Sequence, residues 1–199
     1  MSLPVERDRS IARLRVVAHP LRLRILSLLT GTPMSAAELS RELGVSHALA
    51  SYHLRQLAKT EFLDVAEERS HRGGREVRYR YRNEPAASGL ARGDSQDLSS
   101  LPEALGLFAE ALALELRRRA TTASTSPVLS PLLSDAEVWI SPDHWAALRE
   151  MFDVELRRLH DQARHPRTPG TVRLSVTAAL FEMDSAGGQP AGDPGDGRP

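Results

Sequence analysis

Residues 35–59 hold two short helical patterns joined by a glycine, and this arrangement constrains the fold more than any other part of the sequence. Ser35 and Glu38 have the spacing of a capping box, in which each side chain satisfies a free backbone N–H group at a helix start. Gly44 follows that helix at a position where glycine adopts a left-handed backbone at little cost, and Ser46 can cap the next helix. Two helices joined by about three residues with a glycine in the turn are typical of a helix-turn-helix unit.

The second helix of this pair is predicted from His47 to about Lys59, and its two faces differ in chemistry. Apolar side chains recur at the spacing of a buried stripe, namely Ala50, Leu54 and Leu57. The opposite face carries small, polar and basic side chains, namely His47, Ala48, Ser51, Tyr52, Arg55 and Lys59. Because His53 adjoins the apolar stripe, we interpret it as a partly buried histidine.

The elements on either side of this pair are a helical region and a hairpin. A helix is expected before Pro20, and a second begins at Pro20, a residue that is tolerated in a first turn. Residues 62–65 predict a short strand, and residues 77–82 predict a second because apolar side chains alternate with arginine. Residues 67–75, which are charged and contain two glycines, are interpreted as the tip of the hairpin that joins the two strands.

Residues 83–199 are predicted to form a linker, a mixed helix and strand region, and a tail. Residues 83–101 are rich in Ala, Ser and Gly, which is typical of a linker. Periodicity then predicts, in order, an amphipathic helix at 102–119, a strand at 138–140, a helix from Pro142 to about Arg164 and a strand at 172–180. Residues 185–199 contain five Gly and three Pro, a composition that predicts disorder.

The order and spacing of the elements in residues 15–82 resemble the winged helix-turn-helix domain of ArsR-type bacterial transcription regulators. The segments that carry the resemblance are His19-Pro-Leu-Arg-Leu-Arg-Ile-Leu26, Ala37-Glu-Leu-Ser-Arg-Glu-Leu-Gly-Val-Ser46, Ser51-Tyr-His-Leu-Arg-Gln-Leu57 and Phe62-Leu-Asp-Val65 with the basic hairpin after it. They cover about a third of the chain. The expected fold class is α+β: a winged helix-turn-helix DNA-binding domain at 1–82, the linker, and a small α/β dimerisation or effector region at 102–184.

The resemblance implies that the helix starting at His47 enters the major groove of DNA, where small and hydrogen-bonding side chains can approach base edges. The residues expected to read bases are Ser46, His47, Ser51, Tyr52 and Arg55. Ala48 can contact a thymine methyl group, and Lys59 lies on the same face. Arg55 can pair with guanine or anchor a phosphate, and the sequence leaves both roles open. The hairpin residues implied to contact phosphate or the minor groove are His71, Arg72 and Arg75.

The distribution of charge agrees with a polyanionic partner at the N-terminal end. Residues 1–82 hold fifteen Lys and Arg against nine Asp and Glu, whereas residues 83–199 hold eleven against seventeen. A balance of +6 against −6 favours double-stranded DNA as the partner of residues 1–82, although solvated charge alone would give the same count. We expect a homodimer on an approximately palindromic operator, joined through the helix at 102–119, and the family resemblance implies repression.

Other classes of function find less support. The chain contains no cysteine, which excludes disulfides, thiolate catalysis and cysteine-based metal sites. The histidines do not form a ligand set, and neither a phosphate-binding loop nor a nucleophile elbow is present, so we expect no metal, no cofactor and no enzyme. No segment is apolar enough for a membrane span or a signal peptide, which predicts a cytoplasmic protein.

Two alternatives remain open at this stage. Trp139, Trp145 and Phe152 can form a small core, which we favour, or line a pocket for a small-molecule effector. A winged helix can also dock another protein without binding DNA.

Overall fold

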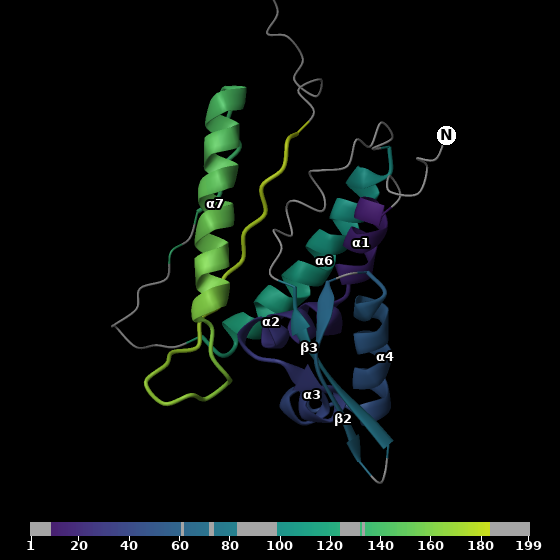
Figure 1. Ribbon diagram of the computed structural model, residues 1–199. Helices are drawn as coiled ribbons and strands as arrows, with labels where there is room; N and C mark the ends of the chain where they lie inside the picture. The colour runs from purple at the N-terminus through teal and green to yellow at the C-terminus, as the bar shows by residue number, and fades with distance from the viewer. Residues whose placement is uncertain are drawn as a thin grey trace, which may run out of the picture.

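The computed structural model describes residues 9–60, 62–71, 74–82, 99–123, 132 and 134–183. The elements in chain order are α1 (Arg9–Val17), α2 (Pro20–Gly31), β1 (Met34–Ser35), α3 (Ala36–Leu43), α4 (His47–Ala58), β2 (Leu63–His71), β3 (Gly74–Tyr81), α6 (Leu101–Ala120) and α7 (Pro142–Gln162) (Figure 1). Helices α3 and α4 with the hairpin β2–β3 form a winged helix-turn-helix, which confirms the predicted α+β fold class. Most of the predicted linker and the tail at 185–199 lie outside the described residues.

The turn between α3 and α4 has the local chemistry that the sequence predicted. The Ser35 backbone N–H donates to Glu38 Oε2 at 2.7 Å, and the Glu38 N–H donates to Ser35 Oγ at 3.4 Å. Gly44 has a φ of 66°, in the left-handed region, and the Ser46 hydroxyl accepts a hydrogen bond from the Leu49 N–H at 3.2 Å. These caps fix both ends of the turn and therefore the direction in which α4 leaves it.

The hydrophobic core lies among the helices and positions α4 firmly. Its largest fully buried side chains are Ile25, Leu29, Met34, Leu39 and Leu57. Helix α4 contributes Ala50, Leu54 and Leu57, which confirms the predicted stripe, and His53 is buried beside them with 6% of its surface exposed. The opposite face of α4 is therefore left for solvent or a partner.

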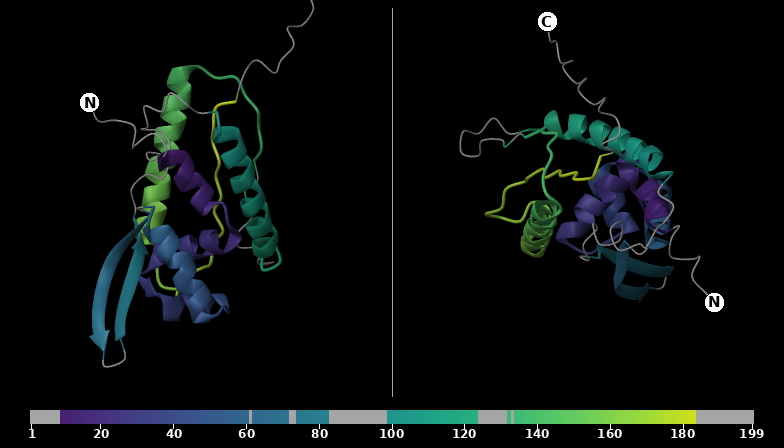
Figure 2. Two further views of the ribbon diagram at one scale, coloured as in Figure 1. Left: turned by 90° about the vertical axis from the view of Figure 1, so that its right-hand side faces the viewer. Right: turned by 90° about the horizontal axis from the view of Figure 1, so that it is seen from above.

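The hairpin is longer than the sequence predicted. The sheet has the antiparallel order β1-β3-β2, and β1 pairs Met34 with Tyr79. Residues 67–75, which were expected to form a loop, instead continue both strands as far as His71 and Gly74. Charged side chains here pair across the hairpin, as Glu68 does with Arg75, so the strands extend without an apolar pattern. The hairpin thus projects away from the helices (Figure 2).

Helix α6 packs against α1 and α2, and its partly buried Leu105 and Phe108 pack against the hydrophobic core. Ala104 and Ala111 are the most buried apolar residues of α6, whereas Leu116 is 50% exposed. Alanines allow two helices to approach closely, so the contact of α6 with its neighbouring helices follows Ala104 and Ala111. Helices α1 and α6 therefore cover one another.

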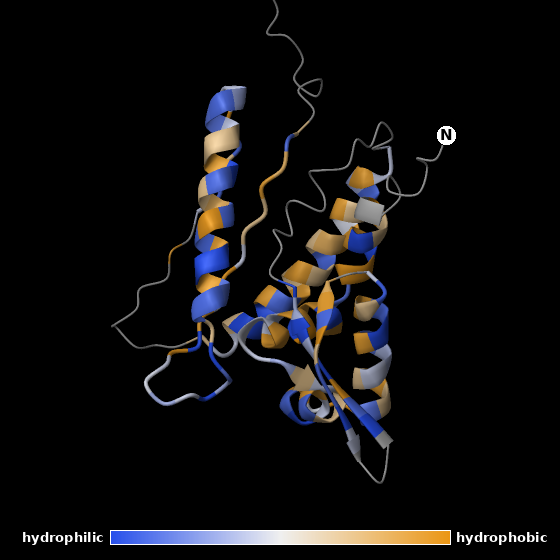
Figure 3. Cartoon of the chain, viewed as in Figure 1, coloured by the Kyte–Doolittle hydropathy of each residue, from blue (hydrophilic) through white to orange (hydrophobic). Residues whose placement is uncertain are grey.

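The C-terminal region differs most from the prediction. Residues 138–140 and 172–180 were expected to form strands, but neither segment forms one, because no partner strand lies beside it among the described residues. Helix α7 begins as predicted, with Ser141 as its cap and Pro142 in its first turn, but none of its residues is buried. Trp139 is 88% exposed, so it does not close a core with other aromatic residues. Apolar and polar residues alternate along α7 and the extended segment beside it (Figure 3).

The end of α7 is nevertheless fixed to the helix-turn-helix unit. A Cβ added to Gly31 would lie 2.6 Å from the Arg164 carbonyl oxygen, so only glycine fits at this contact. Arg167, which has a positive φ of 66°, pairs with both carboxylate oxygens of Glu42 at 2.7 and 3.2 Å. The region after α7 therefore contacts α2 and α3 directly.

Candidate nucleic-acid interface

A groove with a volume of about 540 Å³ lies between α4 and the hairpin. Its lining includes four of the residues that the sequence selected for DNA binding, namely His47, Ser51, Arg55 and Arg75. The first three project from the same side of α4, and Arg75 comes from β3. The fold therefore brings the helix and the hairpin together around one surface, with backbone and side chains of the α3 N-terminus between them.

The other predicted residues of α4 lie around this groove. Ser46, His47 and Ala48 are exposed at the first turn of the helix, where the backbone can approach a ligand closely. Tyr52 is 50% exposed, and its ring meets the ring of His53 edge-on, with centroids 5.1 Å apart. Lys59 is exposed at the far end of α4, about 20 Å along the axis from Ser46. The predicted roles of these residues stay predictions.

The cations of α4 and of the hairpin differ in their partners. Among the described residues, Arg55 and Lys59 form no ion pair. Arg75, by contrast, pairs with Glu68 across the hairpin, and its side chain is 67% exposed. Among the described residues, Arg55 is thus an exposed cation of the groove that forms no ion pair, while Arg75 shares its charge with Glu68.

The positive charge of the hairpin is offset more fully than the sequence suggested. Arg78 donates to both carboxylate oxygens of Glu38, at 2.7 and 3.2 Å, and lies 3.6 Å from a Glu67 oxygen. Arg82 pairs with Asp64 at 2.8 Å. Sequence alternation predicted these arginines on β3 but not their partners, because Glu38 is 40 positions away. The side chain of His71 and all of Arg72 lie outside the described residues.

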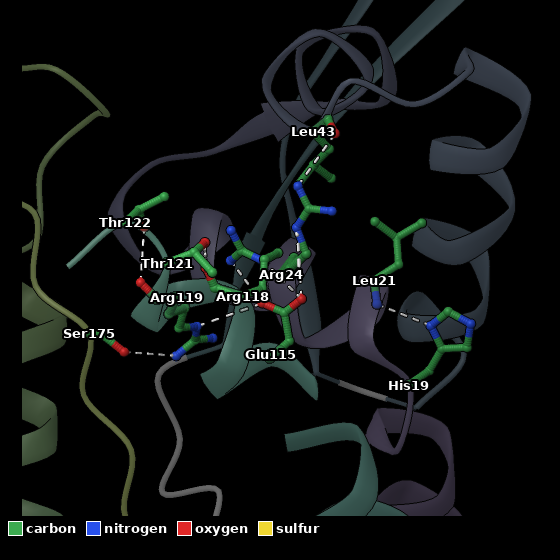
Figure 4. A network of polar contacts seen from close by, with 10 residues as sticks. All are labelled: His19, Leu21, Arg24, Leu43, Glu115, Arg118, Arg119, Thr121, Thr122 and Ser175. Atoms are coloured by element: carbon green, nitrogen blue, oxygen red, sulfur yellow. Dashed lines mark hydrogen bonds and ion pairs between the residues drawn. The ribbon is translucent and has the colours of Figure 1, made fainter. Parts of the chain in front are cut away.

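Of the two arginines on α2, Arg24 is directed into the protein. Its Nη2 donates to the Leu43 carbonyl at 3.4 Å, and its Nε lies 4.0 Å from Glu115 Oε1 (Figure 4). Arg24 therefore ties α2 to the end of α3 and to α6, and it is not placed to contact DNA. Arg22 is different, because its Nε is buried without a hydrogen-bond partner among the described residues.

Glu115 is a buried acid that the sequence interpretation missed. Its side chain is 3% exposed and accepts hydrogen bonds from Arg118 at 2.8 to 3.1 Å, and Arg119 lies 3.7 Å away. Arg119 in turn contacts the Ser175 hydroxyl at 3.5 Å (Figure 4). The signal was present in the sequence, since Glu115 continues the spacing of Ala104 and Ala111 and precedes three arginines.

Two histidines lie where α2 meets α4. The rings of His19 and His53 have centroids 4.6 Å apart, and His19 Nδ1 accepts a hydrogen bond from the Leu21 N–H at 3.1 Å. His53 Nδ1 is buried and has no hydrogen-bond partner among the described residues. Burial lowers the pKa of both imidazoles, and the nearby Arg22 guanidinium lowers both further. Both rings are therefore neutral at pH 7.

Acidification is expected to destabilise the folded chain as these histidines become protonated. The unfolded chain has the ordinary histidine pKa of about 6.5, so it binds protons at a pH where the folded chain does not. The stability is therefore complete above about pH 6.5 and declines as the pH falls below that value. His160, whose pKa is also lowered by burial, acts in the same direction.

The measurement is the urea midpoint of unfolding at about pH 7.5 and about pH 5.5, on either side of the unfolded pKa. The His53→Gln variant should lose less stability between the two values than the wild type does. The matched control, His144→Gln, changes an exposed histidine on α7 and should keep the wild-type difference. A midpoint that rises on acidification would contradict the expectation.

The described residues offer neither a metal site nor a membrane span. No group of three or more His, Asp or Glu side chains in this part of the chain is arranged to hold a metal ion. None of the helices described is long and apolar enough to cross a membrane.

Comparison with known proteins agrees with this geometry. Residues 17–66 match a family model described as a helix-turn-helix domain. The chain is also 34% identical over 83 residues to the HTH-type transcriptional regulator YgaV of Escherichia coli (strain K12), and the alignment covers 41% of this chain and 79% of that protein. The segment that matches the family model includes α2, α3 and α4, the helices around the candidate interface.

Proposed function

The chain belongs to the helix-turn-helix transcriptional regulators, and we propose that it is an ArsR-type repressor that binds an approximately palindromic DNA operator as a homodimer. Helix α4 enters the major groove, and the hairpin contacts the neighbouring backbone. The observation that carries the proposal is the groove itself, in which exposed polar residues of α4 face Arg75 of β3.

The chemistry of the groove supports base reading at its centre. His47 and Ser51 are one turn apart on α4, so both can reach the same base pairs as Arg55. Small side chains at Ala48 and Ser51 let the helix lie deep in the major groove. Lys59, at the C-terminal end of α4, and Arg75, on β3, would contact the phosphate backbone.

The geometry of DNA recognition supports a homodimer. One α4 helix reads only a few base pairs, and a second copy related by a two-fold axis doubles the contact and matches an inverted repeat. Repression is then expected where the operator overlaps a promoter. We propose residues 102–184 as the region that joins the two copies.

The competing function is a winged helix that docks a protein and binds no DNA. Retention of the purified protein on duplex DNA at increasing salt separates the two. Neutralised phosphates release counterions, so a DNA-binding protein should lose affinity linearly in log salt, with a slope of about −0.9 per phosphate contacted. Absence of measurable affinity at low salt would favour the docking module.

A further inference from the structure

The C-terminal region exposes an apolar surface that the single chain leaves uncovered. Nine large apolar side chains of its two extended segments are between 37% and 88% exposed: Val138, Trp139, Ile140, Val172, Leu174, Val176, Leu180, Phe181 and Met183. Helix α7 lies beside these segments with no buried residue, and among the helices and strands it contacts chiefly α2. Residues 171–183 run between α7 and α6, as both views show (Figures 1 and 2).

The backbone of the same segments forms no hydrogen bond with another backbone group of the described residues. Within the described residues, no backbone N–H of 134–140 or 172–183 donates to a backbone carbonyl. Both segments are extended and rich in β-branched or aromatic side chains, a composition that favours strands. In residues 172–180 every even position is apolar, whereas Arg173, Ser175 and Thr177 are polar. One face of this segment is therefore suited to burial in a sheet.

The size of this surface fits a stable interface between two protein chains. An aromatic side chain such as Trp139 or Phe181 presents roughly 150–250 Å², and the seven aliphatic side chains present less, so the nine at about half exposure leave on the order of several hundred Å². A specific interface takes about 800 Å² from each partner, and soluble monomers rarely expose a patch of this size. The polar face of residues 172–180 already contacts α6 of its own chain, since the Ser175 hydroxyl accepts a hydrogen bond from Arg119.

We propose that a second copy of this chain covers this surface, and that the extended segments 134–140 and 171–183 of the two copies form an intermolecular sheet packed on the two α7 helices. A two-fold axis makes such a surface self-complementary, because the apolar face of one segment meets the same face of its copy. This inference deepens the proposed function by naming the surface that joins the two DNA-binding units. Its test uses no DNA, so that each proposal can fail separately.

The test is sedimentation equilibrium of the full chain and of Leu174→Asp. Because Leu174 is 60% exposed in the single chain, aspartate there leaves the monomer fold intact. The wild type should be a dimer at micromolar concentration, and the dissociation constant of the variant should rise at least about tenfold. Trp139→Ser, at a residue 88% exposed, should act in the same direction.

Two controls locate the interface. Thr177→Asp places the same charge on the polar face of the segment and should leave the dimer intact. Val65→Asp changes an outward valine of β2 that is 52% exposed, outside residues 102–184, and should also leave it intact. A dimer that Leu174→Asp leaves intact would overturn this inference alone, whereas a monomeric wild type would overturn both this inference and the homodimer of the proposed function. Loss of DNA binding with an intact dimer would instead contradict the proposed function.

Discussion

Replacing Arg55 with glutamate is expected to abolish specific DNA binding while the winged helix stays folded. Arg55 is exposed in the groove and forms no ion pair among the described residues, whereas α4 is held by the apolar stripe on its other side. Loss of a bidentate contact costs about 1–3 kcal/mol, so Arg55→Ala should weaken binding by roughly 5- to 150-fold. Glutamate adds repulsion from the phosphates and should lower the affinity further.

A third substitution distinguishes the two roles left open for Arg55. Lysine keeps the charge but not the planar fork, so Arg55→Lys should retain most affinity if the residue anchors a phosphate and lose specificity if it reads guanine. The control, Arg149→Glu, makes the same charge change at an exposed residue of α7. Binding curves measured by fluorescence anisotropy should separate the variants, and equal affinity of Arg55→Glu and wild type would contradict the assignment.

Removing the Glu115 carboxylate is expected to cause the largest loss of stability. The side chain is 3% exposed and faces Arg24, Arg118 and Arg119, so alanine would leave partly buried cations without their counterion. Removal of one partner of a buried pair typically costs 3–5 kcal/mol, and we expect about 3 kcal/mol because the arginines reach solvent. Urea unfolding at neutral pH measures the difference.

The matched control for Glu115→Ala is Glu110→Ala, an exposed acid on the same helix that should change the stability little. Glu115→Gln keeps the shape and part of the hydrogen bonding, so its stability should lie between those of the alanine variant and the wild type. If Glu115→Ala and Glu110→Ala unfold at the same urea concentration, the buried network contributes nothing measurable to the fold.

The helix-turn-helix was predictable because its signals are local. Ser35 and Glu38 cap within one turn, and the left-handed backbone at Gly44 depends on that residue alone. The buried position of His53 followed from helical spacing and is confirmed. The position of Arg55 on the exposed face of α4 followed in the same way, so the side of the groove that α4 forms could be predicted.

The remainder depends on contacts between distant segments, which periodicity does not encode. Residues 172–180 have the alternation of a strand, but a strand also needs a neighbour for its backbone, and no described segment supplies one. Helix α6 buries Ala104 and Ala111 rather than Leu116, and the small size of these alanines matters only against a specific partner helix. The pairing of Arg78 with Glu38 likewise requires the hairpin to be folded onto α3.

The most direct test of the central claim is selection of DNA by the purified protein from fragments of the genome that encodes it, followed by sequencing of what is retained. We expect enrichment of an inverted repeat whose half-sites are about one helical turn apart, and loss of that enrichment with Arg55→Ala. Uniform retention of all fragments, or no retention, would contradict a sequence-specific dimeric regulator.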